Sequence, residues 1–105
     1  MHYLNGVFRR LMNYKKHTAF MIEFISDFVN GELERYFFDL DYSAYVIEHF
    51  PYMKIENARV AEHFADTIDW AYERGTDLGL SDEAFRVEIS KALDKWLGTK
   101  KPDIV

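Results

Sequence analysis

The sequence predicts an all-α fold, an antiparallel four-helix bundle formed by one domain of 105 residues. Three observations support this prediction. Apolar residues recur every three or four positions in four successive segments, as they do on the buried face of an amphipathic helix. The segments are separated by Asn30-Gly31, by Phe50-Pro51 and by the glycine-rich stretch 75–79. Short links of this kind make consecutive helices antiparallel neighbours.

The last helix has the clearest signals and is expected over residues 82–97. Ser81 is an N-cap residue, and the acids Asp82 and Glu83 follow in the first turn, where the helix dipole favours negative charge. Gly98 can adopt the left-handed conformation that ends a helix. The residues with helical spacing are Phe85, Ile89, Ala92, Leu93 and Trp96.

The helix before it is expected to begin after Asn57, which can cap it, and to run to about Arg74. Gly75 is expected to end it. Its apolar face consists of Ala61, Phe64, Ala65, Ile68, Ala71 and Tyr72.

The first half of the chain predicts two more helices. Thr18 can cap a helix that Asn30-Gly31 ends. Residues 32–50 are ambiguous, because their Tyr, Phe, Val and Ile content also suits β-strands. We favour helix for this segment because it contains no strong hairpin turn pair. Pro51 is expected to break this helix, since proline disfavours helical geometry at the preceding residue.

The chain divides into a basic N-terminal segment, residues 1–17, a bundle, residues 18–97, and a tail, residues 98–105. The basic segment leaves room for an extra short helix. Residues 1–20 contain Arg9, Arg10, Lys15 and Lys16 and no acidic residue, whereas the whole chain has a net charge of −5. The acidic remainder repels nucleic acid and favours a cationic partner, so we expect no nucleic-acid ligand.

Composition also argues against several other classes of protein. The chain has no Cys, no apolar run of signal-peptide type and no window that could span a membrane, so we expect a cytoplasmic protein without a membrane partner. It has no phosphate-binding glycine loop and no nucleophile elbow. Its histidines lack metal-site spacing, so no metal, no other cofactor and no enzymatic activity are expected. Arg59 and His63 keep a small helical RNase open as an alternative, although their spacing is one residue shorter than that pattern requires.

The most informative charged pattern is a row of carboxylates on the third predicted helix. Its members have i, i+4, i+7, i+11 spacing, which places them within about 60° of one helix face over roughly 16 Å. Like charges at this spacing each cost about a few tenths of a kcal/mol, so the row weakens the helix slightly. A solvated face is the ordinary explanation, and a docking surface for a basic partner is the functional one. The candidate partner-binding residues are Glu62, Asp66, Asp69 and Glu73, with Asp77 and Asp27 as weaker candidates.

Two further stretches of the sequence carry distinctive motifs. One has an apolar helix that ends in Phe-Val-x-Gly, followed by an acid, an aliphatic residue and spaced aromatics. The other has a helix that ends in an aromatic and acidic turn, then an acid-rich cap and a closing amphipathic helix. The residues of these motifs are Phe28, Val29, Gly31, Glu32, Leu33, Phe38, Tyr42, Phe64, Ile68, Asp69, Tyr72, Ser81, Asp82, Glu83, Phe85, Ile89 and Leu93. In these motifs the chain resembles the bacterial self-protective, colicin D-type immunity proteins.

This resemblance covers roughly residues 18–97 and implies a four-helix bundle that binds and blocks a tRNA-cleaving toxin. The toxin would be a colicin or the tip of a contact-dependent inhibition system. A second hypothesis from the residues is another acidic inhibitor, such as a nucleic-acid mimic that acts on a DNA-binding enzyme. Both hypotheses describe a protein that acts by binding, and they leave its oligomeric state open.

Overall fold

The computed structural model describes residues 13–98, and in this part of the chain every regular element is a helix. The prediction of an all-α bundle is therefore confirmed, and so is helix for most of residues 32–50, in which α3 begins at Arg35. The expected extra N-terminal helix falls largely on residues outside the described part. The elements are α2 (Lys16–Val29), α3 (Arg35–Glu56), α4 (Ala58–Phe64), the π-helical turn η1 (Ala65–Asp69), α5 (Trp70–Leu78) and α6 (Asp82–Leu97).

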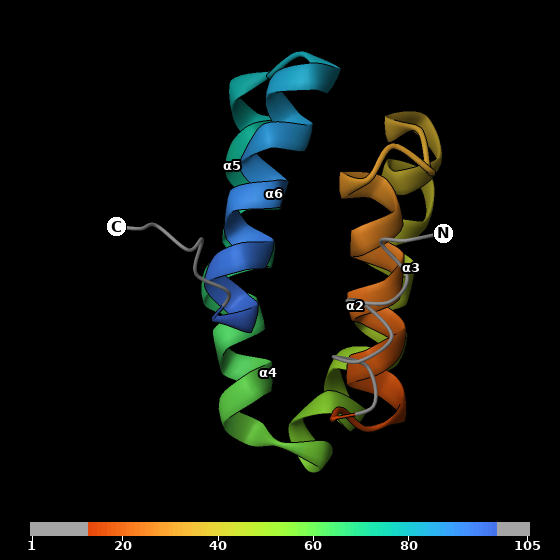
Figure 1. Cartoon of the computed structure of the whole chain (residues 1–105), viewed down its shortest axis with the longest axis vertical. Helices are drawn as coiled ribbons and strands as arrows, with labels where there is room; N and C mark the ends of the chain where they lie inside the picture. Colours follow the sequence, from red (N-terminus) through yellow and green to blue (C-terminus); the bar gives the residue numbers. More distant parts are fainter. Residues whose placement is uncertain (1–12, 99–105) are drawn as a thin grey trace.

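The helices run up and down in sequence order (Figure 1). α2 and α3 form one antiparallel pair, and the continuous rod α4–η1–α5 forms another with α6. The two pairs pack against each other, with α2 beside α6 and α4 beside α3. None of the described helices combines the length and the apolar character that a membrane crossing requires.

The interior of the bundle is built largely from aromatic rings. Phe28 and Phe38 stack with their ring centroids 4.2 Å apart, and Tyr42 stacks on Tyr72 at 3.9 Å. Phe85 of α6 meets Phe28, Phe38 and Tyr72 in edge-on or tilted contacts. Offset and edge-to-face arrangements of this kind are the favourable ones for aromatic pairs. The high aromatic content of the chain is therefore used partly to join all the helices.

Two arginines stabilise the turns at one end of the bundle through hydrogen bonds to backbone carbonyls. The Nε of Arg86 donates to the backbone carbonyl of Phe28, 2.8 Å away, at the C-terminal end of α2, where a cation is favoured. The Nη1 of Arg35 donates to the carbonyl of Leu80 at 2.7 Å, just before α6 begins. Each guanidinium also lies over a phenyl ring, Arg86 over Phe28 and Arg35 over Phe85.

At the opposite end, the expected N-cap of α2 is wrong. α2 begins at Lys16, so Thr18 lies inside the first turn and caps nothing. The carboxylate of Glu56, at the end of α3, takes the role instead. It accepts the backbone N–H groups of His17 (2.7 Å) and Thr18 (2.9 Å), and the Thr18 hydroxyl at 2.6 Å. A negative group at a helix N-terminus satisfies unpaired amides and interacts well with the dipole.

The expected break at Pro51 is also wrong, because α3 continues through it to Glu56. Pro51 is exposed, so the backbone hydrogen bond that it removes lies on the solvent side. Buried residues before and after it, His49 and Met53, hold the two parts of α3 against the core. Packing of the apolar face thus outweighs the local preference of the Phe50-Pro51 pair.

Gly75 lies within α5, so the prediction that it ends the helix is wrong as well. The helix ends at Gly79, which adopts φ +65° and whose N–H donates to the Thr76 carbonyl. Gly75 is buried and faces Phe85: a Cβ at this position would lie 2.6 Å from the Cδ1 of that ring. The absence of a side chain, and not left-handed backbone, explains glycine here.

Two histidines meet near the N-terminus of α2. The Nδ1 atoms of His17 and His49 are 2.8 Å apart, so one donates a hydrogen bond to the other. Phe20 stacks on His49 at 4.2 Å, and Tyr52 stacks on His17 at 4.5 Å. Burial lowers the pKa of His49 from its ordinary 6.5, and the charge of His17 acts in the same direction.

We expect the stability of the protein to fall as the pH drops below about 6.5. In that range the unfolded chain protonates His49 at its ordinary pKa while the folded chain does not, so protons favour unfolding until the lower folded pKa is reached. Urea denaturation between pH 7.5 and pH 5 tests this. His49→Gln keeps a polar group but cannot titrate, so its pH dependence should be shallower; identical slopes for the two proteins would contradict the prediction.

Candidate partner-binding surface

The predicted carboxylate row lies on the rod α4–η1–α5. Asn57 caps this rod, since its Oδ1 accepts the backbone N–H of Val60 at 3.2 Å. The π-helical turn η1 interrupts the middle, where the Thr67 hydroxyl donates to the His63 carbonyl at 2.7 Å and competes for it with the backbone. A π turn adds an extra residue to the hydrogen-bonded ring, so the constant 100° increment assumed from the sequence does not hold across it.

The structure places the six candidate residues in three different settings. Glu62, Asp66, Glu73 and Asp77 are exposed on the rod, and from here on we call these four residues the acidic ridge. Asp69 is half-buried, and its Oδ1 accepts the Tyr42 hydroxyl of α3 at 2.8 Å. Asp27 is half-buried on α2, in the other helix pair (Figure 1). Burial, with the charges of Glu23 and Glu32, raises its pKa.

Two hydrogen bonds from tyrosine hydroxyls to carboxylates connect α3 with the rod. Burial raises the pKa of Tyr42 well above its ordinary value, and the Asp69 charge adds to this effect, so the hydroxyl stays a donor. In the same way, burial and the nearby Asp39 raise the pKa of Tyr72 to about 12, and its hydroxyl donates to Asp39 at 3.1 Å. Asp69 therefore serves the contact between α3 and the rod and is less available to a partner than the acidic ridge.

The acidic ridge is not neutralised by the basic side chains that the structure describes. Within residues 13–98, the Lys and Arg residues that form ion pairs do so elsewhere, Arg35 with Asp39 and Asp82, and Lys91 with Glu88. Arg74 lies on the rod itself, but its guanidinium lies over the ring of Trp70, 5.4 Å from the centroid. The negative field of the ridge is thus largely open to solvent.

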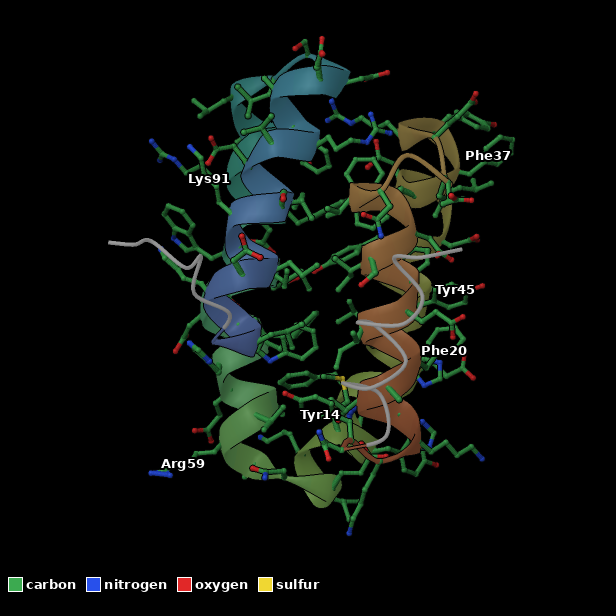
Figure 2. The ribbon with its side chains drawn as sticks, viewed as in Figure 1. Tyr14, Phe20, Phe37, Tyr45, Arg59 and Lys91 are labelled. Atoms are coloured by element: carbon green, nitrogen blue, oxygen red, sulfur yellow. The ribbon has the colours of Figure 1, made fainter. Side chains whose placement is uncertain are left out.

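Three grooves lie along the rod beside the acidic ridge, and Glu73 and Asp77 line the third, of about 260 Å³, with Trp70 and Leu78. One, of about 420 Å³, is lined by Tyr14, Arg59, Val60, Glu62, His63, Asp66 and Trp96. The Trp96 Nε1 donates to the Val60 carbonyl at 3.0 Å, which ties α6 to the start of α4 beneath this groove. Arg59 extends from the lower end of the rod (Figure 2). Glu62 and Asp66 therefore share this groove with the aromatic side chains of Tyr14 and Trp96.

The second groove, of about 300 Å³, lies between α5 and α6 and contains an exposed tryptophan. Trp70 is 60% exposed and Leu78 is 59% exposed, and both line it. Trp70 is not among the binding residues predicted from the sequence. The signal that could have indicated it is a large aromatic residue outside the apolar face of its own helix. Trp is among the residues enriched in the energetic centres of protein interfaces.

Metal binding finds no support among residues 13–98, where no group of three or more His, Asp or Glu side chains is placed to hold an ion. Glu62, His63 and Asp66 lie close together in sequence, but their side chains are not placed to hold an ion together.

No protein-family model, curated protein or solved structure matches the chain.

Proposed function

We propose that this protein is a cytoplasmic immunity protein that binds and blocks a basic nuclease toxin domain, a tRNA-cleaving one by the resemblance of its sequence. The observation that carries the proposal is the acidic ridge, four exposed carboxylates with which no described Lys or Arg forms an ion pair. A nuclease binds phosphates through cationic side chains, and carboxylates on a rigid rod can occupy the same positions.

The physical basis is electrostatic steering combined with apolar contact. Complementary charge raises the rate at which two proteins meet, and it does so without any chemistry in the binding protein. None of the Lys and Arg residues in the described part of the chain forms an ion pair with the ridge that a partner would have to break. Trp70 and Leu78, which lie beside Glu73 and Asp77 along one groove wall, would supply the apolar centre of the interface.

The proposal predicts a toxin gene directly upstream of this one, and charge reversal on the ridge tests the proposal with the nuclease domain that such a gene encodes. We expect Asp66→Lys combined with Glu73→Lys to lower the association rate constant roughly tenfold or more and to flatten its dependence on salt. Both positions are exposed, so stability should change by less than about 0.5 kcal/mol each. Stopped-flow binding at several ionic strengths gives both quantities. Asp69 is left intact because it holds Tyr42.

The matched control is Glu23→Lys combined with Glu32→Lys, which makes the same change in net charge at exposed positions away from the rod. An equal loss of rate in both double variants would show that net charge alone matters, and would contradict the ridge. Cleavage of tRNA by the purified protein, abolished by His63→Ala, would instead assign the protein to the small helical RNases. An upstream gene for a DNA-binding enzyme would favour the nucleic-acid mimic.

A further inference from the structure

The outer face of α3 is apolar over most of its length although no other described helix covers it. Leu40 is 62% exposed, Ile47 is 77% exposed and Ile55 is 80% exposed. Phe37, 48% exposed, points away from the bundle (Figure 2). We call this surface the α3 stripe: Phe37, Leu40, Ala44, Ile47, Pro51 and Ile55.

The α3 stripe lies opposite the face that α3 buries in the core. The core face carries Phe38, Tyr42, His49 and Met53, all at most 8% exposed. A helix that is apolar all round is normally covered on all sides. Most of the stripe follows the alternating three- and four-residue spacing of a coiled-coil seam, and its ends are about 27 Å apart along the helix. This length suits a partner helix of about five turns.

Charge along the edges of the stripe indicates which partner fits. Glu34, Asp41 and Glu48 recur every seven residues and therefore form a continuous acidic edge on one side. Asp39, closer to the core side, is already paired with Arg35. The other edge carries Tyr36 and Ser43, which are uncharged, and the exposed Lys54 near the C-terminal end of α3. A helix with Lys or Arg along one flank would complement the acidic edge.

A second copy of this chain fits the stripe poorly in either direction. In an antiparallel pair the acidic edges of the two copies would face each other, which brings Asp41 of one copy near Glu48 of the other. In a parallel pair the two Lys54 side chains would meet in the seam. Like charges opposed across a helix pair are unfavourable, so the observations favour a different protein.

We propose that the α3 stripe is a docking surface for an amphipathic, basic helix of a partner protein. The stripe lies on the helix pair opposite the rod that carries the acidic ridge, so this binding does not depend on the toxin-blocking function. The protein would then hold two partners on separate faces.

The test uses two synthetic 21-residue helical peptides with Leu at the seam positions. One carries Lys on its flanks and the other carries Glu. We expect the Lys peptide to bind in fluorescence-anisotropy titrations and the Glu peptide to bind at least tenfold more weakly. Leu40→Gln combined with Ile47→Gln should weaken the Lys peptide at least tenfold, and Asp41→Asn combined with Glu48→Gln should reduce the salt dependence of its binding.

The control is Val87→Gln, which removes an apolar side chain that is 49% exposed on α6 and should leave binding unchanged. Circular dichroism verifies that each variant folds. Equal binding of both peptides, or full binding by the Leu40/Ile47 variant, would overturn the proposal. So would a dimer in sedimentation velocity that the same variant dissociates, because a second copy would then occupy the stripe. Loss of peptide binding in the Asp66/Glu73 variant alone would place the peptide on the ridge and also overturn it.

Discussion

Gly75→Ala is expected to destabilise the bundle by about 1–3 kcal/mol, the range for inserting a methyl group into a well-packed core. Intrinsic helix propensity alone predicts the opposite sign, since Ala is favoured over Gly by about 1 kcal/mol inside a helix. Packing decides the result. The new Cβ would lie 2.6 Å from the Cδ1 and 2.8 Å from the Cε1 of Phe85.

Phe85 has little freedom to move away from that methyl group. It is fully buried, Arg35 covers its ring at 4.0 Å, and Tyr72 meets it at 5.6 Å. Urea denaturation compared with Thr76→Ala, an exposed neighbour in the same helix, measures the effect. Combining Gly75→Ala with Phe85→Leu should cost less than the sum of the two single changes, because Leu lacks the clashing ring atoms. A Gly75→Ala protein that is more stable than the wild type would contradict this packing argument.

Glu56→Ala is expected to cost about 2 kcal/mol or more at neutral pH. It removes the acceptor for two backbone N–H groups at the start of α2 and for the Thr18 hydroxyl, which is buried. Loss of a helix N-cap costs about 1 kcal/mol, and donors left unsatisfied in a partly buried site cost more. Glu56→Gln keeps one acceptor oxygen and should fall between the wild type and Glu56→Ala.

The cost of Glu56→Ala should shrink in acid. Burial alone would raise the pKa of Glu56, but hydrogen bonds from Thr18 and the two backbone amides outweigh it and lower the pKa below 4.5. A carboxyl group with a lowered folded pKa stabilises the protein above its unfolded pKa, and this contribution is lost as the pH falls through the folded value. Urea denaturation at pH 7 and pH 3 tests this, with the exposed Glu48→Ala as control. An equal cost at both pH values would contradict the capping role.

Local signals in the sequence predicted the fold and one helix almost to the residue. α6 spans Asp82–Leu97, with the side chain of Ser81 accepting the Ala84 N–H and Gly98 in left-handed conformation at its end. The predicted cap at Asn57 is confirmed as well. These features depend only on residues a few positions apart, so a sequence window contains all the interacting groups.

The three local predictions that are wrong, at Thr18, Pro51 and Gly75, concern positions where tertiary contacts determine the structure. Pro51 remains helical because its neighbours are buried, Gly75 is required by a ring 10 residues further along the chain, and Thr18 gives way to Glu56 from another helix. The partners of Gly75 and Thr18 lie 10 or more residues away, and the burial of the residues around Pro51 depends on the other helices, so no local pattern could report these outcomes.

The same division holds for the candidate surfaces. The sequence by itself determined which carboxylates lie on the rod and how far apart they are along the chain, but the π-helical turn η1 changed their angular positions. Only the tertiary structure decided that Asp69 faces Tyr42 while Glu62, Asp66, Glu73 and Asp77 face solvent, and that the outer face of α3 is left uncovered. The orientation of a face depends on which helices pack against it, and that choice is made by the burial of the whole core.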